Sequence, residues 1–174
     1  MSVDIDRLFK TYHATLVRYL TRRLGDRDWA DEVAQETFVR VLRQETIVNE
    51  RAWLFAVATN LVRDEARKDA RRRKHLELLR HEAEVEADAE PEPSTADKAQ
   101  ETAFARKALD ALAERDRLAL LMREEGLDYK EIAEALELSF SSVGTTLARA
   151  RRRLAESYEA LVRERDGGKG HVAS

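Results

Sequence analysis

Hydrophobic residues recur at helical spacing along most of the chain. In the first half, an apolar stripe extends from Ile5 to Leu24, and the next residue, Gly25, is of the type that commonly ends a helix. A second helix is expected from Asp28, which can cap its first turn. Its apolar face comprises Val33, Phe38, Val41 and Leu42. Both segments therefore predict amphipathic helices that share a core.

A polar stretch, residues 44–49, separates these helices from a longer third one. That helix is expected to begin near Asn49 and to continue into the basic residues 63–74, and it would pack through Trp53, Val57 and Leu61. In the second half, apolar positions predict one helix around residues 104–112 and another that ends at Gly126. Only six glycines and two prolines occur, and 37% of residues are charged, which together favour an all-α fold.

Residues 128–154 have the pattern of a helix-turn-helix. Asp128 and Glu131 have the spacing of a capping box, and the flanking Leu127 and Ile132 that of a hydrophobic staple. After a short turn a second apolar face begins at Val143, and this helix is expected to end in four arginines between positions 149 and 153. Such a cationic end suits DNA phosphates. The alternative is a helical hairpin with a solvated basic end.

Charge is strongly segregated, although the net charge is only −3. Residues 63–74 hold seven Lys or Arg against three Asp or Glu, a net charge of +4. Residues 77–97 then hold eight Asp or Glu against one Arg, a net charge of −7. An acidic protein would ordinarily be a poor candidate for nucleic-acid binding, but each block has to be interpreted separately.

Several classes of site are not expected. The chain has no cysteine, which excludes disulfides, thiolate metal sites and cysteine nucleophiles. The four histidines are scattered, and no active site, metal or cofactor is predicted. No apolar run reaches the length of a membrane span and no signal peptide is expected, so a cytoplasmic protein without membrane insertion is predicted.

The acidic stretch around residues 82–97 contains both prolines and no apolar periodicity, and it is expected to be a flexible linker. Two small helical domains result, the second a helix-turn-helix domain. The predicted boundaries are 1–76 for the first domain, 77–99 for the linker, 100–165 for the second domain and 166–174 for a disordered tail.

Residue types alone leave three features open. The polar side chains of the second helix could form only a solvated face. Trp53 and Phe55 could lie in the core or stack on unpaired bases, with the core favoured for Trp53. Asn60 could be a satisfied core amide or a group that hydrogen-bonds a base edge.

The order of four motifs resembles the extracytoplasmic-function (ECF) sigma factors, a two-domain class of bacterial RNA polymerase specificity subunits. The motifs are DEVAQETFVRVLR, RAWLFAVATN with its basic run, LDALAERDRLALLMREEGLDYKEIAEAL and RARRRL. The resemblance covers Asp4 to about Leu161. It implies a first domain corresponding to sigma region 2, a second corresponding to region 4, and an acidic linker that either threads into the polymerase cleft or is a solubilising spacer.

For the first domain, the resemblance implies core docking and recognition of the −10 element. Contacts to the β′ clamp helices would come from Asp31, Glu32, Gln35 and Glu36, with Phe38 as support. Trp53 would lie at the upstream edge of the melted −10 element, and Asn60 would line a pocket for a flipped base. Residues 44–49, including Gln44 and Asn49, would close over that base. Phosphate contacts would come from Arg63, Arg67, Lys68 and Arg71.

For the second domain, the resemblance implies recognition of the −35 element, with departures from the family pattern. Glu137 stands where glycine is common, and Gly144 and Thr146 stand where basic residues are usual. Ser141 is expected to cap the recognition helix. The predicted −35 contacts are Ser141, Ser142, Thr145, Thr146, Arg149 and Arg151. Fewer cations predict weaker phosphate binding. In the first domain, Ala56 likewise replaces a frequent arginine.

The expected function is therefore that of an ECF-type sigma factor, which is not itself an enzyme and takes no small-molecule substrate. Its expected partners are core RNA polymerase, through the β′ clamp helices and the β flap, and promoter DNA. Many members of the resembled family are also held by an anti-sigma factor, and the residues leave open whether this chain has one. Two alternatives remain from residue chemistry: a stand-alone helix-turn-helix regulator and a helical protein-binding adaptor. The promoter sequence and the inducing signal do not follow from the residues.

Overall fold

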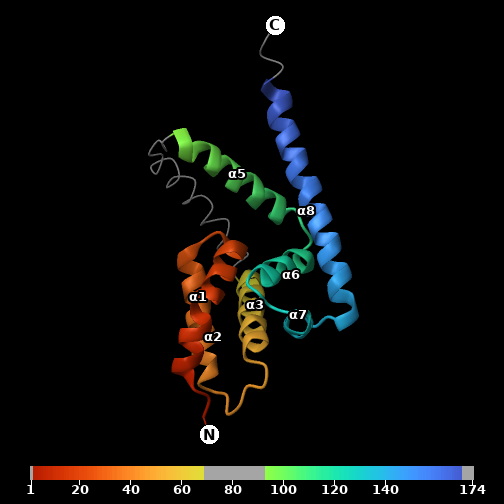
Figure 1. Ribbon diagram of the computed structural model, residues 1–174. Coiled ribbons are helices and arrows are strands. Elements are labelled where there is room, and N and C mark those ends of the chain that lie inside the picture. The colour runs from red at the N-terminus through yellow and green to blue at the C-terminus, as the bar shows by residue number, and fades with distance from the viewer. Residues whose placement is uncertain (1, 69–92, 170–174) are drawn as a thin grey trace. The chain divides into compact units, whose positions relative to one another are not determined.

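The computed structural model describes residues 2–68 and 93–169, and every regular element within these ranges is a helix (Figure 1). The predicted all-α class is confirmed. The helices are α1 (Ile5–Leu24), α2 (Arg27–Val41), α3 (Glu50–Lys68), α5 (Pro93–Asp110), α6 (Glu114–Glu124), α7 (Tyr129–Leu136) and α8 (Phe140–Lys169).

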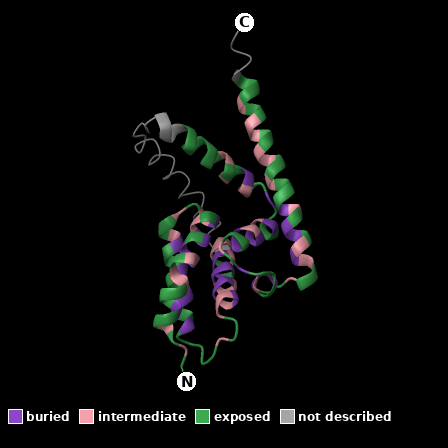
Figure 2. Cartoon of the chain, viewed as in Figure 1, coloured by how far each residue is buried: buried purple, intermediate pink, exposed green. Residues whose placement is uncertain are grey.

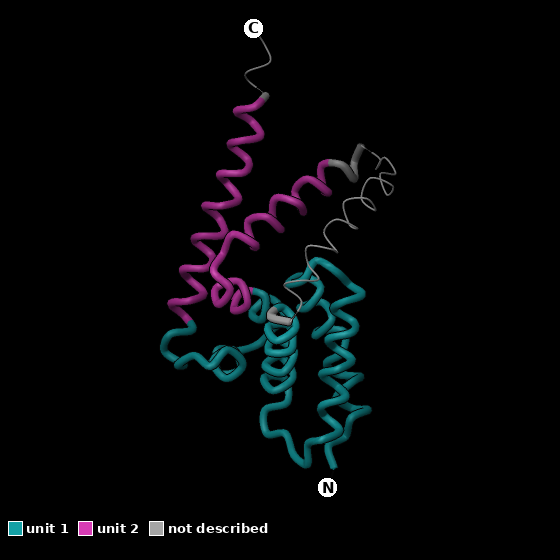
Figure 3. Tube along the Cα trace, turned by 180° about the vertical axis from the view of Figure 1, so that it is seen from behind, with its two compact units in different colours: residues 1–87, 121–143 teal, residues 88–120, 144–174 magenta. Residues whose placement is uncertain are grey.

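The chain divides into two compact units (Figure 3). Residues 1–87 and 121–143 form the first unit, and residues 88–120 and 144–174 form the second. The sequence predicted two domains that follow one another along the chain, whereas each unit combines two separate segments. The reason is that the end of α6 and all of α7 group with α1, α2 and α3.

The core of the first unit lies where α1, α2 and α3 face one another (Figure 2). Tyr19 and Phe55 are both fully buried there, with ring centroids 4.9 Å apart. The Tyr19 hydroxyl hydrogen-bonds the hydroxyl of Thr59 at 2.8 Å, so the polar tip of the tyrosine is satisfied. Burial raises the pKa of Tyr19. Phe55 is thus a core residue and does not stack on bases.

The turn between α1 and α2 confirms one boundary prediction and corrects another. Gly25 ends α1 in the left-handed conformation, with φ of 71°, as predicted. The cap of α2 is Asp26 rather than Asp28, because Asp26 is extended and its carboxylate accepts the Trp29 N–H at 3.1 Å. Asp28 lies in the first turn, where its charge complements the helix dipole.

The helix-turn-helix segment begins as its sequence predicts. Asp128 Oδ1 accepts the Glu131 N–H at 2.8 Å, and Glu131 Oε1 accepts the Asp128 N–H at 3.1 Å, which completes the capping box. Leu127 and Ile132, the predicted staple residues, are fully buried. Glu137 ends α7 with φ of 55°, the one non-glycine residue of the described ranges with positive φ.

Three of the expected limits fall inside helices of the structure. The linker was expected to reach residue 99, but α5 begins at Pro93, whose missing N–H and fixed φ suit the first helical position. The tail was expected from residue 166, but α8 continues to Lys169 because Gly167 and Gly168 do not adopt the left-handed conformation that ends helices. The arginines 149–153 consequently lie within α8 and not at its end.

Ser141 does not cap α8. The helix begins at Phe140, so Ser141 lies in its first turn. The residue before the helix is Ser139, whose carbonyl oxygen accepts both the backbone N–H and the hydroxyl of Ser142, at 3.0 and 2.9 Å.

Candidate functional site

The predicted docking face of α2 is a continuous exposed strip. Asp31, Glu32, Gln35 and Glu36 are all exposed, whereas the alternating positions Val33, Ala34, Thr37 and Phe38 are buried. This alternation follows from the helical period, which places the polar side chains on the side opposite the core. The strip is acidic because three of its four side chains are carboxylates. Within the described part of the chain, Glu36 is the one of the four with an ion-pair partner, Arg40 at 3.6 Å.

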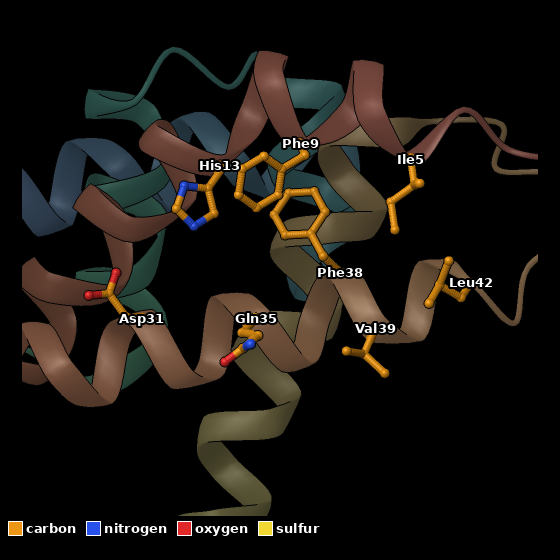
Figure 4. A pocket seen from close by; sticks show the side chains of 8 residues that line it. All are labelled: Ile5, Phe9, His13, Asp31, Gln35, Phe38, Val39 and Leu42. Atoms are coloured by element: carbon orange, nitrogen blue, oxygen red, sulfur yellow. The ribbon is translucent and has the colours of Figure 1, made fainter.

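A groove between α1 and α2 adjoins this strip (Figure 4). It has a volume of about 430 Å³ and is lined by Ile5, Phe9 and His13 from α1 and by Asp31, Gln35, Phe38, Val39 and Leu42 from α2 or its end. Phe9 stacks on His13 with ring centroids 4.2 Å apart, and its edge meets Phe38 at 5.2 Å. Aromatic rings therefore form part of the lining of the groove.

Three exposed hydrophobic side chains line this groove. Phe9, Val39 and Leu42 are 45%, 41% and 67% exposed, and they are three of the six exposed large hydrophobic residues in the described part of the chain. Leu42, expected in the core, lies just beyond the last residue of α2 and lines the groove instead. The contribution of α1 was missed, because the sequence stripe gives Phe9 the same spacing as core residues.

The predicted −10 residues occupy α3 and the loop before it. Trp53 is half-buried and Asn60 is exposed, which leaves both side chains accessible from solvent. Gln44 and Asn49 are exposed in the loop, where Asn49 Nδ2 donates to Glu134 Oε2 at 2.7 Å. Arg63 Nη1 lies 3.5 Å from Asn60 Oδ1, at the upper limit for a hydrogen bond.

The remaining basic residues of this set are only partly described. Arg67 and Lys68 belong to α3, but their side chains lie outside the described residues. Arg71 also lies outside them.

The predicted −35 residues are divided by their exposure. Ser141, Thr145 and Arg151 are exposed, and Ser142 is half-buried. Thr146 is only 5% exposed, so its hydroxyl is not available to DNA in this structure. Thr146 is buried because it lies on the inner side of α8, next to the buried Leu147.

Arg149 is held by an acidic residue that sequence patterns did not reveal. Its Nε and Nη2 donate to the two carboxylate oxygens of Asp116, at 3.1 and 2.7 Å. The Asp116 side chain is only 1% exposed, and Arg153 Nη1 lies 3.6 Å from its Oδ2. The hydrogen bonds from Arg149 keep the pKa of Asp116 below its usual value, and the same pairing raises the pKa of Arg149.

A second groove lies in the second unit, between α5 and α8. Its volume is about 330 Å³, and it is lined by Ala105, Leu109, Arg151, Leu154, Ala155 and Tyr158. Apart from Arg151 at its rim and the hydroxyl of Tyr158, the lining is aliphatic or aromatic.

Among residues 2–68 and 93–169, no three His, Asp or Glu side chains gather as metal ligands would. None of the helices in these same ranges combines the length and hydrophobicity of a membrane span.

Comparison with known proteins assigns the chain to a class. Residues 8–72 match the family described as sigma-70 region 2, and residues 105–154 match sigma-70 region 4. A helical region 2 with an exposed polar helix, followed by a region 4 helix-turn-helix, defines a transcription factor of the sigma type.

Two curated relatives agree with this class, and one solved structure shares the fold. The ferric citrate uptake sigma factor FecI of Escherichia coli is 34% identical over 154 residues, covering 86% of this chain and 87% of FecI. The ECF RNA polymerase sigma factor SigL of Mycobacterium tuberculosis is 34% identical over 122 residues, covering 67% of this chain and 62% of SigL. The solved structure of sigma factor RpoE with the anti-sigma factor NepR from Bartonella quintana has a TM-score of 0.63 and 19% identity, covering 90% of this chain and 97% of RpoE.

The chain belongs to the sigma-70 family of RNA polymerase sigma factors, in its ECF class. It is a sigma factor that directs transcription initiation, and its relatives are not enzymes. Neither a stand-alone regulator nor a protein-binding adaptor is favoured by this membership.

Proposed function

We propose that the chain docks on core RNA polymerase through the exposed face of α2 together with the groove between α1 and α2. The supporting observation is the joining of two features at one place: the acidic strip that begins at Asp31, and the apolar groove rimmed by Phe9 and Leu42. An apolar centre beside a polar rim is the usual anatomy of a protein interface. The partner that fits this surface is a helix of the polymerase β′ subunit with apolar anchor residues and flanking basic residues.

The second docking surface we propose is the groove between α5 and α8, which would receive an apolar segment of the polymerase β flap. Its lining by Leu109, Leu154 and Tyr158 supplies the apolar area, and Arg151 at its rim can pair with an acidic residue of the partner. Arg151 thus has two proposed roles, one here and one at the −35 element.

Promoter recognition would be shared between the two regions. Trp53 and Asn60 offer an aromatic face and an amide on accessible positions of α3, as needed to hold an unpaired −10 base. The exposed Ser141, Thr145 and Arg151, with Ser142 and Arg149, form the proposed −35 set. Thr146 is left out because it is buried.

An anti-sigma factor and a cytoplasmic location complete the proposed function. RpoE, which shares the fold, is bound to an anti-sigma factor in its solved structure, and we include such a factor among the proposed partners. The proposed site of action is the cytoplasm, where polymerase and promoters are found.

Gel filtration of the chain with core RNA polymerase tests the docking proposal. The expected result is a co-migrating complex that binds promoter fragments which neither component binds alone. Absence of co-migration, together with tight duplex binding by the free chain, would contradict it and favour a stand-alone regulator.

A further inference from the structure

The recognition helix carries few cations in its DNA-reading part. From Phe140 to Arg149, the first ten residues of α8, Arg149 is the single charged residue. The side chain that gives this segment its charge is also the one fixed by Asp116. What Asp116 does to Arg149 therefore matters for any sequence preference of α8.

The pairing uses one edge of the guanidinium group. A guanidinium has five N–H donors, and Asp116 accepts one each from Nε and Nη2. The Nη1 and Nη2 edge keeps three N–H groups. Two parallel donors on that edge match the O6 and N7 acceptors of guanine, or two oxygens of a phosphate.

Asp116 is buried and Arg149 is partly exposed, as expected if Asp116 positions Arg149 and Arg149 contacts DNA. The Asp116 side chain is 1% exposed, whereas that of Arg149 is 38% exposed. The carboxylate is thus fixed inside the protein, and the arginine extends from it toward solvent. An arginine held in one rotamer before binding loses less conformational entropy when it meets a base.

The charge of the cluster remains suited to DNA. Arg153 lies 3.6 Å from the same carboxylate, so two arginines surround one aspartate. The net charge of the three side chains is positive, and the pairing does not cancel the attraction to phosphates.

We infer that Asp116 is a positioning residue for −35 recognition, which holds Arg149 so that its outer edge reads one base of the element. This inference rests on the proposed −35 role of α8. It assigns a part in DNA recognition to a residue of α6, outside the helix that enters the groove. In this arrangement specificity at that base depends on Asp116, while the attraction to phosphates does not.

The test uses holoenzyme assembled from core polymerase and the full chain. Duplexes randomised over promoter length are selected by binding, and the bases recovered at each −35 position are counted for the parent chain, Asp116→Asn and Arg149→Ala. Asparagine keeps the size of aspartate but loses its charge. Asp110→Asn is the matched control, because Asp110 meets Arg106 and Arg117 at the protein surface, at 3.5 Å each.

Arg149→Ala and Asp116→Asn are expected to lose the same base preference, by about tenfold, while Asp110→Asn keeps it. The double variant, with Asp116→Asn and Arg149→Ala together, should lose no more of this preference than Arg149→Ala alone. The dependence of affinity on salt should fall only when Arg149 is removed, since a freed arginine still neutralises phosphate. Melting curves of each chain accompany the selection.

Different failures point to different conclusions. If Asp116→Asn weakens binding equally at every base, or keeps the preference that Arg149→Ala loses, Asp116 has a structural role only and the inference is overturned. Retention of the full preference by Arg149→Ala overturns it as well. If the parent holoenzyme selects no duplex at all, the proposed promoter function fails first.

Discussion

Arg51 and Glu131, 80 positions apart in the chain, form a bidentate ion pair that joins α3 to α7 within the first unit. Arg51 Nε and Nη2 donate to the two carboxylate oxygens at 2.7 and 2.6 Å. Glu131 is also the acceptor of the capping box of α7, so one carboxylate serves a local and a long-range bond. Two more bonds within the first unit also join residues that are distant in the sequence: Asn49 donates to Glu134, and Arg18 pairs with Glu125.

The two roles of Glu131 can be separated by substitution. Glu131→Gln keeps an acceptor for the capping box but removes the charge opposite Arg51, and it is expected to lower the free energy of unfolding by about 0.5–1 kcal/mol, since the pair is partly exposed. Glu131→Ala loses both bonds and should cost about 1 kcal/mol more. Urea denaturation at pH 7 measures both. Equal losses in the two variants would show that only one of the bonds contributes.

Acid should remove the contribution of this pair. The hydrogen bonds from Arg51 lower the pKa of Glu131, so the folded protein binds its proton less readily than the unfolded chain does. The contribution is complete above the unfolded pKa of about 4.3 and disappears as pH falls through the lower folded pKa. Urea denaturation from pH 7 to pH 3 should show the parent and Glu131→Gln converging at the acid end. A constant difference over this range would contradict the cause assigned to the shift.

Local signals were predictable from sequence, and distant pairings were not. The capping box at Asp128 and the helix stop at Gly25 depend on neighbouring residues, and both predictions are confirmed. The cap of α2 was misplaced by two residues because Asp26 and Asp28 are chemically equivalent, and only the chain direction after Gly25 selects between them. Asp116 carries no local signal, since its role depends on α8 reaching it from 33 positions away.

The candidate surfaces follow the same division. Helical periodicity correctly predicted that the polar strip of α2, which includes Gln35, is exposed. The same periodicity assigned Leu42 to the core, because a pattern cannot show that the helix ends one residue earlier. Thr146 was taken for a DNA contact by its alignment with a basic family position, although its side chain is buried.

Glycine in place of Glu137 should stabilise the helix-turn-helix. Glu137 has φ of 55° and ψ of 44°, a conformation that costs an L-residue with a Cβ about 1 kcal/mol and glycine almost nothing. The greater flexibility of glycine in the unfolded chain offsets part of this gain, so Glu137→Gly is expected to raise the unfolding free energy by about 0.5 kcal/mol. Thermal melts measure it. Glu137→Ala, which removes the charge and keeps the Cβ, should give no gain; an equal gain would assign the effect to charge.

A charge at the groove between α1 and α2 should weaken core binding and leave the fold intact. Leu42 is 67% exposed, so Leu42→Glu costs little packing, but it places a carboxylate where an apolar anchor of the polymerase would lie. A loss of about tenfold in affinity for core is expected, measured by competition against the parent chain. Phe140→Glu is the matched control, because Phe140 is 64% exposed and does not line the groove. Equal effects of the two variants would argue against docking at this groove.

Removal of the Asn60 amide should change −10 base preference without loss of core binding. Asn60 is exposed on α3, seven residues after Trp53, and its amide can donate to and accept from the edge of an unpaired base. Asn60→Ala should therefore reduce discrimination at one −10 position by about 1–3 kcal/mol, while promoters with the other bases at that position are transcribed as before. Transcription from a set of single-base −10 variants measures this, with gel filtration to verify the complex with core. Asp64→Ala, an exposed residue one turn further along α3, is the control and should keep the parent preference. If Asn60→Ala leaves the ranking of the −10 variants unchanged, the pocket role is excluded. If transcription falls equally for all variants, Asn60 either stabilises the fold or contacts the DNA backbone.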